Sequence, residues 1–345
     1  MTQIQYLKNP RADEIDDSPA EFLQQLGQAS CIVLDGEDTS RNRAFVTLLH
    51  GNEPSGTKAL FRWLKSGQKP AVTTICIVAS VQAALEEPVF EYRVLPDMRD
   101  LNRCFRAPFD DGQGMLAKEI LDLLQEYNPE AVVDMHNTSG SGPGFGVAIY
   151  ADAKHKALVS LFTNRLVTND LRLGALMEIS EHLFPTVTIE CGGRLDDDAD
   201  ELAWLGFQRF FTLTDIFTAE NIEEDIEVLR NPVRLELADD CNLEYADVPG
   251  ADHDLILKTD IECHNFGLVK KGTQLGWVGD KGLSIFSASN IESECVLDEL
   301  LTIENKCLYT SQNLKLFMIT NNPVIAKMDC LFYAVKDNGN DISEF

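Results

Sequence analysis

The chain has 345 residues and a formal net charge of −27, a length that suits one large α/β unit with a smaller second domain. So acidic a chain repels nucleic acid and anionic membrane surfaces, so we expect neither as a partner. Its apolar runs fall short of the roughly 20 residues needed to cross a bilayer, its first residues resemble no signal segment and its nine cysteines form no CxxC pair, so we expect a cytoplasmic protein with reduced thiols.

Apolar, β-branched segments alternate with amphipathic ones over the first two-thirds of the chain. Strands are predicted at residues 31–34, 44–49, 73–78, 131–134, 146–150 and 186–189, and helices at 55–64, 115–127, 154–166 and 199–218. Near-continuous apolar strands are typical of a sheet that is covered on both faces. The pattern therefore predicts an α/β domain over residues 1–220, with a mostly parallel or mixed central sheet flanked by helices.

The last third of the chain has a different pattern. Short strand-like pieces are separated by Gly, Asn and Asp, as in residues 266–279, with little helical periodicity. This pattern predicts a smaller β-rich C-terminal domain over residues 221–345. The acidic stretch 220–227 is the expected boundary, although a charged helix end would look the same.

The first chemical motif is the segment 49–56, between a predicted strand and a predicted helix. It contains His50 and Glu53, three residues apart, with Gly51 and Asn52 between them. On a tight turn this spacing lets an imidazole nitrogen and a carboxylate converge on one metal ion. Taken alone, the motif also fits an ordinary helix entrance.

A second motif follows the strand predicted at 131–134. Asp134 and His136 are two residues apart, so on a strand their side chains point to the same side. This arrangement suits a metal-binding histidine that is oriented by a neighbouring carboxylate. The alternative is that Asp134 simply caps the following turn.

A third motif ends the strand predicted at 186–189. Glu190 precedes Cys191 and the pair Gly192-Gly193. Open α/β sheets place their sites at the carboxyl ends of strands, where a carboxylate can act as a general base. An ordinary loop glutamate would give the same local sequence.

Together the three motifs supply the side chains that a catalytic zinc site needs. His50, Glu53 and His136 are three protein ligands, which leaves a further position for water, and Glu190 is a carboxylate that can take a proton from it. We therefore predict one zinc ion per chain and metal-assisted hydrolysis of a carbonyl compound.

The segment 92–103 supplies cations in an otherwise acidic chain. Arg93 or Arg99 is a candidate for stabilising an oxyanion, and Asn102 with Arg103 is a candidate for gripping a substrate carboxylate. The alternative is that these arginines are surface residues paired with nearby carboxylates.

These motifs resemble the aspartoacylase and succinylglutamate desuccinylase family, relatives of the zinc carboxypeptidases. The resemblance covers roughly residues 40–220 and rests on the segments 50–53, 100–103, 134–137 and 189–190. It implies that His50, Glu53 and His136 bind zinc and that Glu190 is the general base and acid. It also implies that Asn102 and Arg103 bind the carboxylate of an amino acid, with Arg93, or else Arg99, as the oxyanion residue.

The resemblance leaves the substrate open. The family's further substrate-binding arginine, which precedes the catalytic glutamate in aspartoacylases, has no counterpart here, because Arg172 is distant and position 182 is a histidine. We predict a deacylase that cleaves a small N-acyl amino acid, and the negative charge favours a neutral or cationic amino acid over succinylglutamate. The rivals are a zinc carboxypeptidase acting on peptides and a non-catalytic zinc-binding protein; homo-oligomer formation stays open.

Overall fold

The computed structural model describes residues 4–170, 172–218, 226–250, 253–290, 292–328, 330–337 and 342–343. The chain divides into two compact units. Unit 1 comprises Met1–Asn137, Gly144–Leu166 and Arg172–Glu227, and unit 2 comprises Thr138–Pro143, Val167–Leu171 and Val228–Phe345. The boundary expected between residues 220 and 221 lies outside the described residues.

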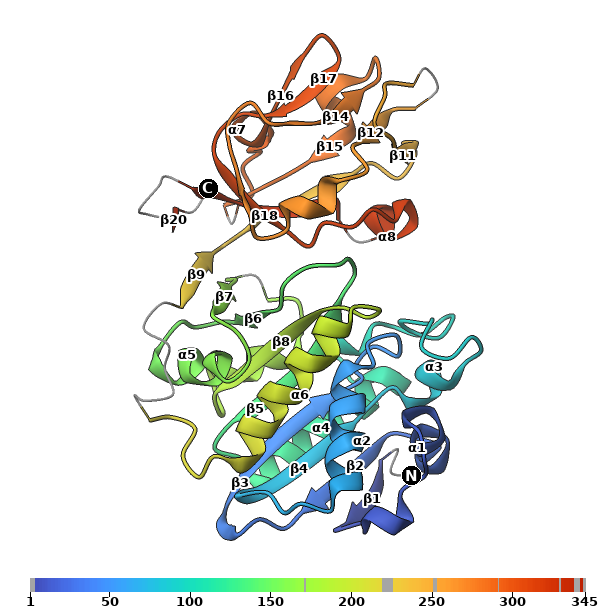
Figure 1. The fold of residues 1–345 in the computed structure, drawn as a ribbon, viewed down its shortest axis with the longest axis vertical. Helices are drawn as coiled ribbons and strands as arrows, with labels where there is room; N and C mark the ends of the chain where they lie inside the picture. The colour runs from blue at the N-terminus through green and yellow to red at the C-terminus, as the bar shows by residue number, and fades with distance from the viewer. Residues whose placement is uncertain are drawn as a thin grey trace. The chain divides into compact units, whose positions relative to one another are not determined.

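The strands of unit 1 belong to a nine-stranded mixed sheet (Figure 1), in which the residues of β9 after Glu227 are assigned to unit 2. In spatial order the strands are β1 (Gln5–Lys8), β2 (Ser30–Leu34), β4 (Val72–Val78), β3 (Asp38–Thr47), β5 (Val132–Thr138), β8 (Thr186–Gly193), β6 (Phe145–Ala148), β7 (Arg165–Thr168) and β9 (Glu227–Arg230). The central pairs β4–β3 and β3–β5 are parallel, whereas β2–β4 and β6–β8 are antiparallel.

Helices accompany this sheet in sequence. They are α1 (Pro19–Leu26), α2 (Ser55–Ser66), α3 (Val81–Leu85), α4 (Gly112–Tyr127), α5 (Ala153–Ser160) and α6 (Asp197–Thr212), with the 3-10 turns η1 (Ala12–Glu14), η2 (Leu101–Arg103) and η3 (Leu176–Glu181). Helix α4, for example, begins at a capping side chain: Asp111 accepts a hydrogen bond from Gly114 N at 2.7 Å.

Alternating residues of β3 explain why helices cover both faces. Ala44 and Val46 belong to one apolar cluster with Ile120 and Leu124 of α4. The intervening Phe45 points the other way and packs edge-on against Phe207 of α6, with ring centroids 4.7 Å apart. Helices α2 and α6 therefore lie on one face and α4 on the other (Figure 1).

The predicted fold class is confirmed, with differences at the edges. Each predicted strand overlaps an observed one, but β1, β7 and β9 were not predicted. The helix expected at 154–166 ends at Ser160, and Arg165 begins β7. The helix expected at 199–218 begins at Asp197 and ends at Thr212. A strand of four residues is too short for a clear period-2 pattern, which is why these three were missed.

Unit 2 is rich in β-structure. One sheet has the order β13 (Leu268–Val269), β18 (Leu314–Phe317), β19 (Phe332–Asp337), β10 (Val233–Leu237) and β15 (Phe286–Ser287), with β20 (Ile342–Ser343) paired to β19. The other has the order β11 (Leu243–Tyr245), β12 (Leu255–Leu257), β14 (Gln274–Val278), β17 (Cys307–Thr310) and β16 (Leu301–Glu304). The short helices are α7 (Leu297–Leu300) and α8 (Pro323–Met328), with the 3-10 turns η5 (Ile261–His264) and η6 (Gly282–Ile285).

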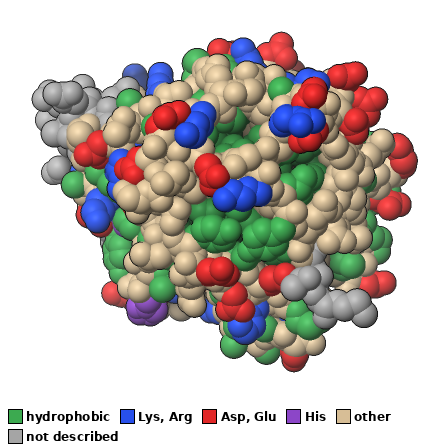
Figure 2. All heavy atoms as spheres, turned by 90° about the horizontal axis from the view of Figure 1, so that it is seen from below, with side chains coloured by type: hydrophobic (Ala, Val, Ile, Leu, Met, Phe, Trp, Pro, Cys, Tyr) green, Lys and Arg blue, Asp and Glu red, His purple; other side chains and the backbone are tan. Residues whose placement is uncertain are grey.

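The surface carries charges of both signs. On the face shown in Figure 2, acidic and basic side chains are interspersed around an apolar area rather than gathered into one basic patch. Within the described part of the chain, no helix is both long and apolar enough to span a bilayer.

Candidate metal centre

Three neighbouring strands of unit 1 bring the predicted site residues together. Strands β3, β5 and β8 are consecutive in the sheet, and β3 runs parallel to β5 with Thr47 opposite Met135. His50 and Glu53 follow the end of β3, His136 lies near the end of β5, and Glu190 lies on β8. The motifs that are separate in sequence therefore converge on one region of the sheet.

The turn after β3 has little room for side chains. A Cβ atom on Gly51 would lie 2.6 Å from Ala83 C and 2.7 Å from Tyr92 O. Gly51 N also donates a hydrogen bond to Arg93 O at 2.9 Å. Glycine at this position thus lets the turn pack directly against the segment that carries Arg93.

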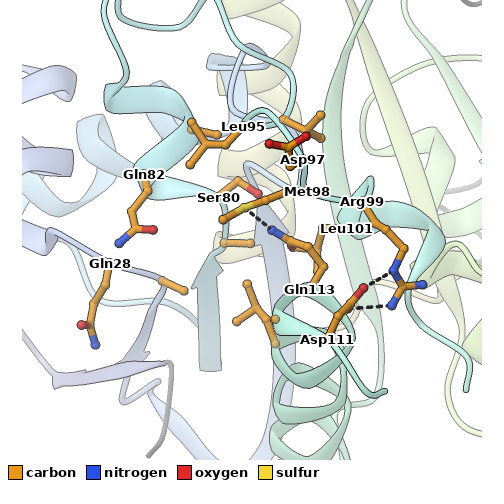
Figure 3. A pocket seen from close by; sticks show the side chains of 16 residues that line it. Gln28, Ser80, Gln82, Leu95, Asp97, Met98, Arg99, Leu101, Asp111 and Gln113 are labelled. Atoms are coloured by element: carbon orange, nitrogen blue, oxygen red, sulfur yellow. Dashed lines mark hydrogen bonds and ion pairs between the residues drawn. The ribbon is translucent and has the colours of Figure 1, made fainter. Parts of the chain in front are cut away.

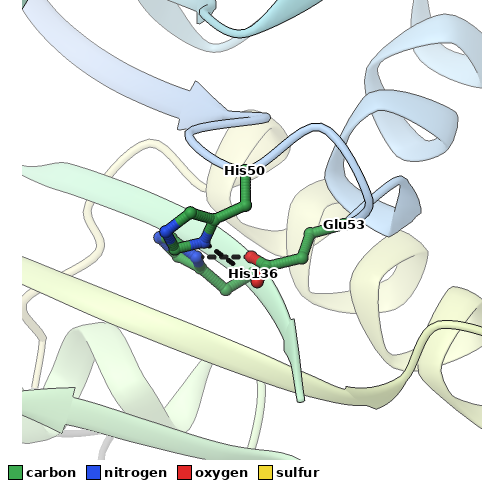
Figure 4. Close-up of side chains that lie close together, drawn as sticks. All are labelled: His50, Glu53 and His136. Carbon is green, nitrogen blue, oxygen red and sulfur yellow. Dashed lines mark hydrogen bonds and ion pairs between the residues drawn. The ribbon is translucent and has the colours of Figure 1, made fainter. Parts of the chain in front are cut away.

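His50, Glu53 and His136 form a buried cluster (Figure 4). One ligand atom from each lies within 4.8 Å of the others. Glu53 Oε1 lies 2.9 Å from His50 Nδ1, and Glu53 Oε2 lies 2.6 Å from His136 Nδ1. Although it lies close to Glu53, the Nδ1 atom of His50 forms no hydrogen bond within the described residues, so it is suited to bind a metal ion.

Each histidine is oriented by a carboxylate on the far side of its ring. His136 Nε2 lies 2.8 Å from Asp134 Oδ2, as the spacing of these residues on a strand predicted. His50 Nε2 lies 2.8 Å from Asp100 Oδ1. A carboxylate behind the ring fixes the tautomer, which leaves Nδ1 of both histidines directed at the cluster.

The protonation of the cluster follows from its burial and its charges. Burial opposes ionisation of Glu53, but the two histidines outweigh it and hold the pKa of Glu53 well below its usual range. Burial alone would lower the pKa of His136, but the neighbouring carboxylates of Asp134 and Glu53 outweigh it and hold the pKa well above its usual value. The carboxylates beside His136 therefore favour its protonated form, and binding of a metal ion to Nδ1 would release a proton.

Glu190 lies beside the cluster in a different electrostatic state. Burial is the main reason that its pKa rises to about 7; His136 opposes the rise and Glu53 adds to it. Its Oε2 is buried and has no hydrogen-bond partner among the described residues. A carboxylate whose pKa lies near neutrality can both take up and release a proton, as a general base and acid must.

The predicted arginines lie in different places. Arg93 reaches the cluster, donating hydrogen bonds to Glu53 Oε1 at 3.0 Å and to Asp100 Oδ2 at 3.1 Å. Arg99 does not, because its Nη2 donates to Asp111 Oδ1 at 2.8 Å, at the start of α4. Of the two candidates for the oxyanion residue, the structure brings only Arg93 to the metal ligands.

Asn102 and Arg103 lie in η2, directly after Asp100. Asn102 is buried, and its Oδ1 accepts a hydrogen bond from Leu176 N at 2.9 Å. Arg103 is exposed and donates to Asn102 O at 2.7 Å. The oxygen of Asn102 thus anchors η3, whereas Arg103 presents its guanidinium at the surface of unit 1.

Asp100 contacts both His50 and Arg93, a role that sequence reasoning missed. Its position at the head of the segment 100–103 was the available signal. Asp100 and His50 are 50 positions apart in the chain, so the contact could not be predicted, because only the folded loop brings the two residues together.

Comparison with known proteins finds a family model that matches residues 44–200. The family is described as "Succinylglutamate desuccinylase/Aspartoacylase catalytic domain". These residues belong to that family. The resemblance noted in the sequence is thereby confirmed, and the desuccinylase/aspartoacylase family is one of hydrolases. No curated protein matches the sequence.

Several solved structures share the fold at low sequence identity. Succinylglutamate desuccinylase from Vibrio cholerae is 14% identical with a TM-score of 0.54, over 96% of this chain and 99% of that one. A succinylglutamate desuccinylase/aspartoacylase from Rhodobacter sphaeroides is 15% identical with a TM-score of 0.54, over 83% and 82%. Murine aminoacylase 3 is 16% identical with a TM-score of 0.50, over 87% and 95%.

Proposed function

We propose that this protein is a zinc-dependent hydrolase that cleaves the amide bond of a small N-acyl amino acid, releasing a carboxylate and an amino acid. The observation that carries the proposal is the pairing of a buried His-Glu-His cluster with Glu190, whose buried Oε2 has no hydrogen-bond partner among the described residues. A protein that only binds a metal ion has no use for a carboxylate with a pKa near 7 beside its ligands.

The donor set of the cluster fits zinc. Two imidazole nitrogens and one carboxylate oxygen, from His50, His136 and Glu53, are the ligands common in catalytic zinc sites, which leave a position for water. Zinc, when bound there, would polarise a carbonyl group and lower the pKa of a coordinated water to about 7. Asp134 and Asp100 would hold the imidazole rings of His136 and His50 in the orientation that directs Nδ1 at the metal ion.

The remaining roles belong to side chains of unit 1. Glu190 would receive a proton on its buried carboxylate and return it to the leaving amine. Arg93, already directed at Glu53 Oε1, would supply a positive charge near the developing oxyanion. Asn102 and Arg103 would hold the substrate carboxylate; only Arg103 is exposed enough to do so without rearrangement.

The experiment that tests the proposal is a metal analysis of the purified protein, together with an amine-release assay on N-acyl amino acids and short peptides, each with and without chelator. About one zinc per chain and chelator-sensitive release from N-acyl amino acids would support it. Selective release from peptides would instead identify a carboxypeptidase. Bound zinc without turnover on either class would favour a binding protein on the same scaffold.

The same proposal extends to the protein's location and partners. We place this hydrolase in the cytoplasm. Its negative charge repels nucleic acid and anionic membranes, so we propose neither as a partner. Its substrate is a small molecule.

A further inference from the structure

Unit 1 contains a cavity that is distinct from the metal cluster. It has a volume of about 380 Å³ and lies between the segment 94–101, the start of α4 and the residues around Ser80 at the end of β4. Figure 3 shows side chains from these segments directed toward it, among them Gln82, Met98 and Gln113. None of the three metal-ligand candidates lines this cavity.

One segment separates the cavity from the metal cluster. Val94, Leu95 and Leu101 line the cavity. Arg93 and Asp100, at the two ends of the same segment, contact Glu53 and His50. Any ligand that shifts this segment must therefore move the two residues that hold the metal ligands in place.

A residue that lines the cavity forms hydrogen bonds with the turn that carries His50. Ser80 lines the cavity, and its Oγ donates a hydrogen bond to Leu49 O at 2.9 Å. Its backbone N donates to Leu48 O at 2.7 Å. Leu48 is buried with φ of 61°, a left-handed conformation that a leucine adopts only under constraint from its surroundings. The cavity thus adjoins the turn on a second side.

The lining indicates the chemical class of the ligand. The Oε1 of Gln113 is buried and lacks a hydrogen-bond donor within the described residues, and Asp97 adds a carboxylate. The one lining arginine, Arg99, is already paired with Asp111. The cavity therefore offers hydrogen-bond acceptors and negative charge, while Leu101 and Leu116 supply apolar walls.

We propose that this cavity binds a small aliphatic amine, and that its occupancy alters the metal centre through the segment 93–101. The ammonium group pairs with Asp97 and donates to Gln113, and the aliphatic part lies against the apolar wall. Binding and metal affinity are then coupled, so each changes the other by the same factor. The coupling rests on the proposed metal site, whereas the binding does not.

Binding is tested on chelator-treated full-length protein with three probes of equal chain length, namely butylamine, butyrate and 1-butanol. We expect calorimetry to detect butylamine in preference to the other two. Asp97→Asn should weaken butylamine binding about tenfold, since a charge-assisted hydrogen bond is lost. Asparagine tolerates the positive φ of 64° at this position, so the substitution removes charge without straining the loop.

The matched control is Asp110→Asn, which removes the same charge from an exposed residue outside the lining. It should leave butylamine binding unchanged. Equal weakening in both variants, or equal binding of butyrate and butylamine, would mean attraction to the acidic surface and would overturn the site.

Coupling is tested by measuring zinc affinity with a competing chelator, with and without butylamine. A change of several-fold in the native protein that disappears in Asp97→Asn supports the proposal. Butylamine binding that leaves zinc affinity unchanged overturns the regulatory part. A protein that binds butylamine but no zinc would contradict the proposed function while leaving the cavity assignment in place.

Discussion

Asp100 joins His50 to Arg93 through its two oxygens, with Oδ1 2.8 Å from His50 Nε2 and Oδ2 3.1 Å from Arg93 Nη2. Burial raises the pKa of Asp100, but its hydrogen bond to His50 and the nearby Arg93 together bring the pKa below its usual range. The residue thus stays ionised and can orient a ligand histidine and a cation at once.

Asp100→Asn should lower zinc affinity by about 10–100-fold, because an amide orients the His50 ring less strongly than a carboxylate does. Chelator competition at neutral pH measures the effect. Asp110→Asn, an exposed carboxylate in the same region of the chain, is the control. Equal zinc affinity in Asp100→Asn and the native protein would show that this contact does not support a metal ligand.

His136→Ala should abolish stoichiometric zinc binding, since it removes one of three ligands from a buried cluster. Metal content after dialysis, determined by elemental analysis, measures this. His182→Ala is the control, because the side chain of His182 is 86% exposed and lies outside the cluster. Zinc retained at one equivalent in His136→Ala would place the metal elsewhere.

Glu190→Gln should keep zinc and lose at least about 100-fold in kcat, the usual contribution of a general base. The amide has nearly the same shape as the carboxylate but cannot take up the proton. Amine release and zinc content are measured on the same preparation, with Glu201→Gln as a control on an exposed glutamate. An active Glu190→Gln variant would show that the base is another group.

The same substitution should stabilise the metal-free protein at alkaline pH. The pKa of Glu190 is raised from 4.5 to about 7 in the fold, so the folded state binds more protons than the unfolded state between these values. Native stability therefore falls as pH rises from about 4.5 to about 7 and stays low above it. Glu190→Gln removes this loss.

We expect the chelator-treated Glu190→Gln variant to exceed the native protein by about 3 kcal/mol in unfolding free energy at pH 8, and by nothing below pH 4. Urea unfolding at the two pH values measures the difference. A gap of equal size at both would mean that it arises from packing rather than from ionisation.

The central sheet and the clustering of the metal-ligand candidates could be predicted because each depends on local pattern. Apolar runs mark β3, β4, β5 and β8; His136 lies on β5, and His50 and Glu53 lie in the turn between β3 and α2. Convergence then follows from the rule that active sites form at the carboxyl ends of adjacent strands.

The contacts that loop residues make could not be predicted from the sequence. Arg93 and Arg99 are six residues apart in one segment, yet one contacts Glu53 and the other pairs with Asp111. Nothing in composition or periodicity distinguishes them, since the path of the loop decides which arginine faces the cluster. The cavity lined by Asp97 and Gln113 likewise could not be predicted from the sequence, because its lining residues come from separate segments between residues 28 and 116.

The last prediction concerns the charge of the substrate. With a formal net charge of −27, the protein should repel a multiply charged anion at long range. We expect kcat/KM for N-succinylglutamate to rise with ionic strength from 0.02 to about 0.2 M, as screening shortens to about 10 Å or less. An N-acyl derivative of a cationic amino acid has no net charge, because its side chain offsets its carboxylate, so it is the control and its kcat/KM should change little. An N-acyl derivative of a neutral amino acid carries one negative charge, and its kcat/KM should rise less steeply than that of N-succinylglutamate. Rapid turnover of succinylglutamate that is insensitive to salt would show that local cations, such as Arg103, dominate over the overall charge.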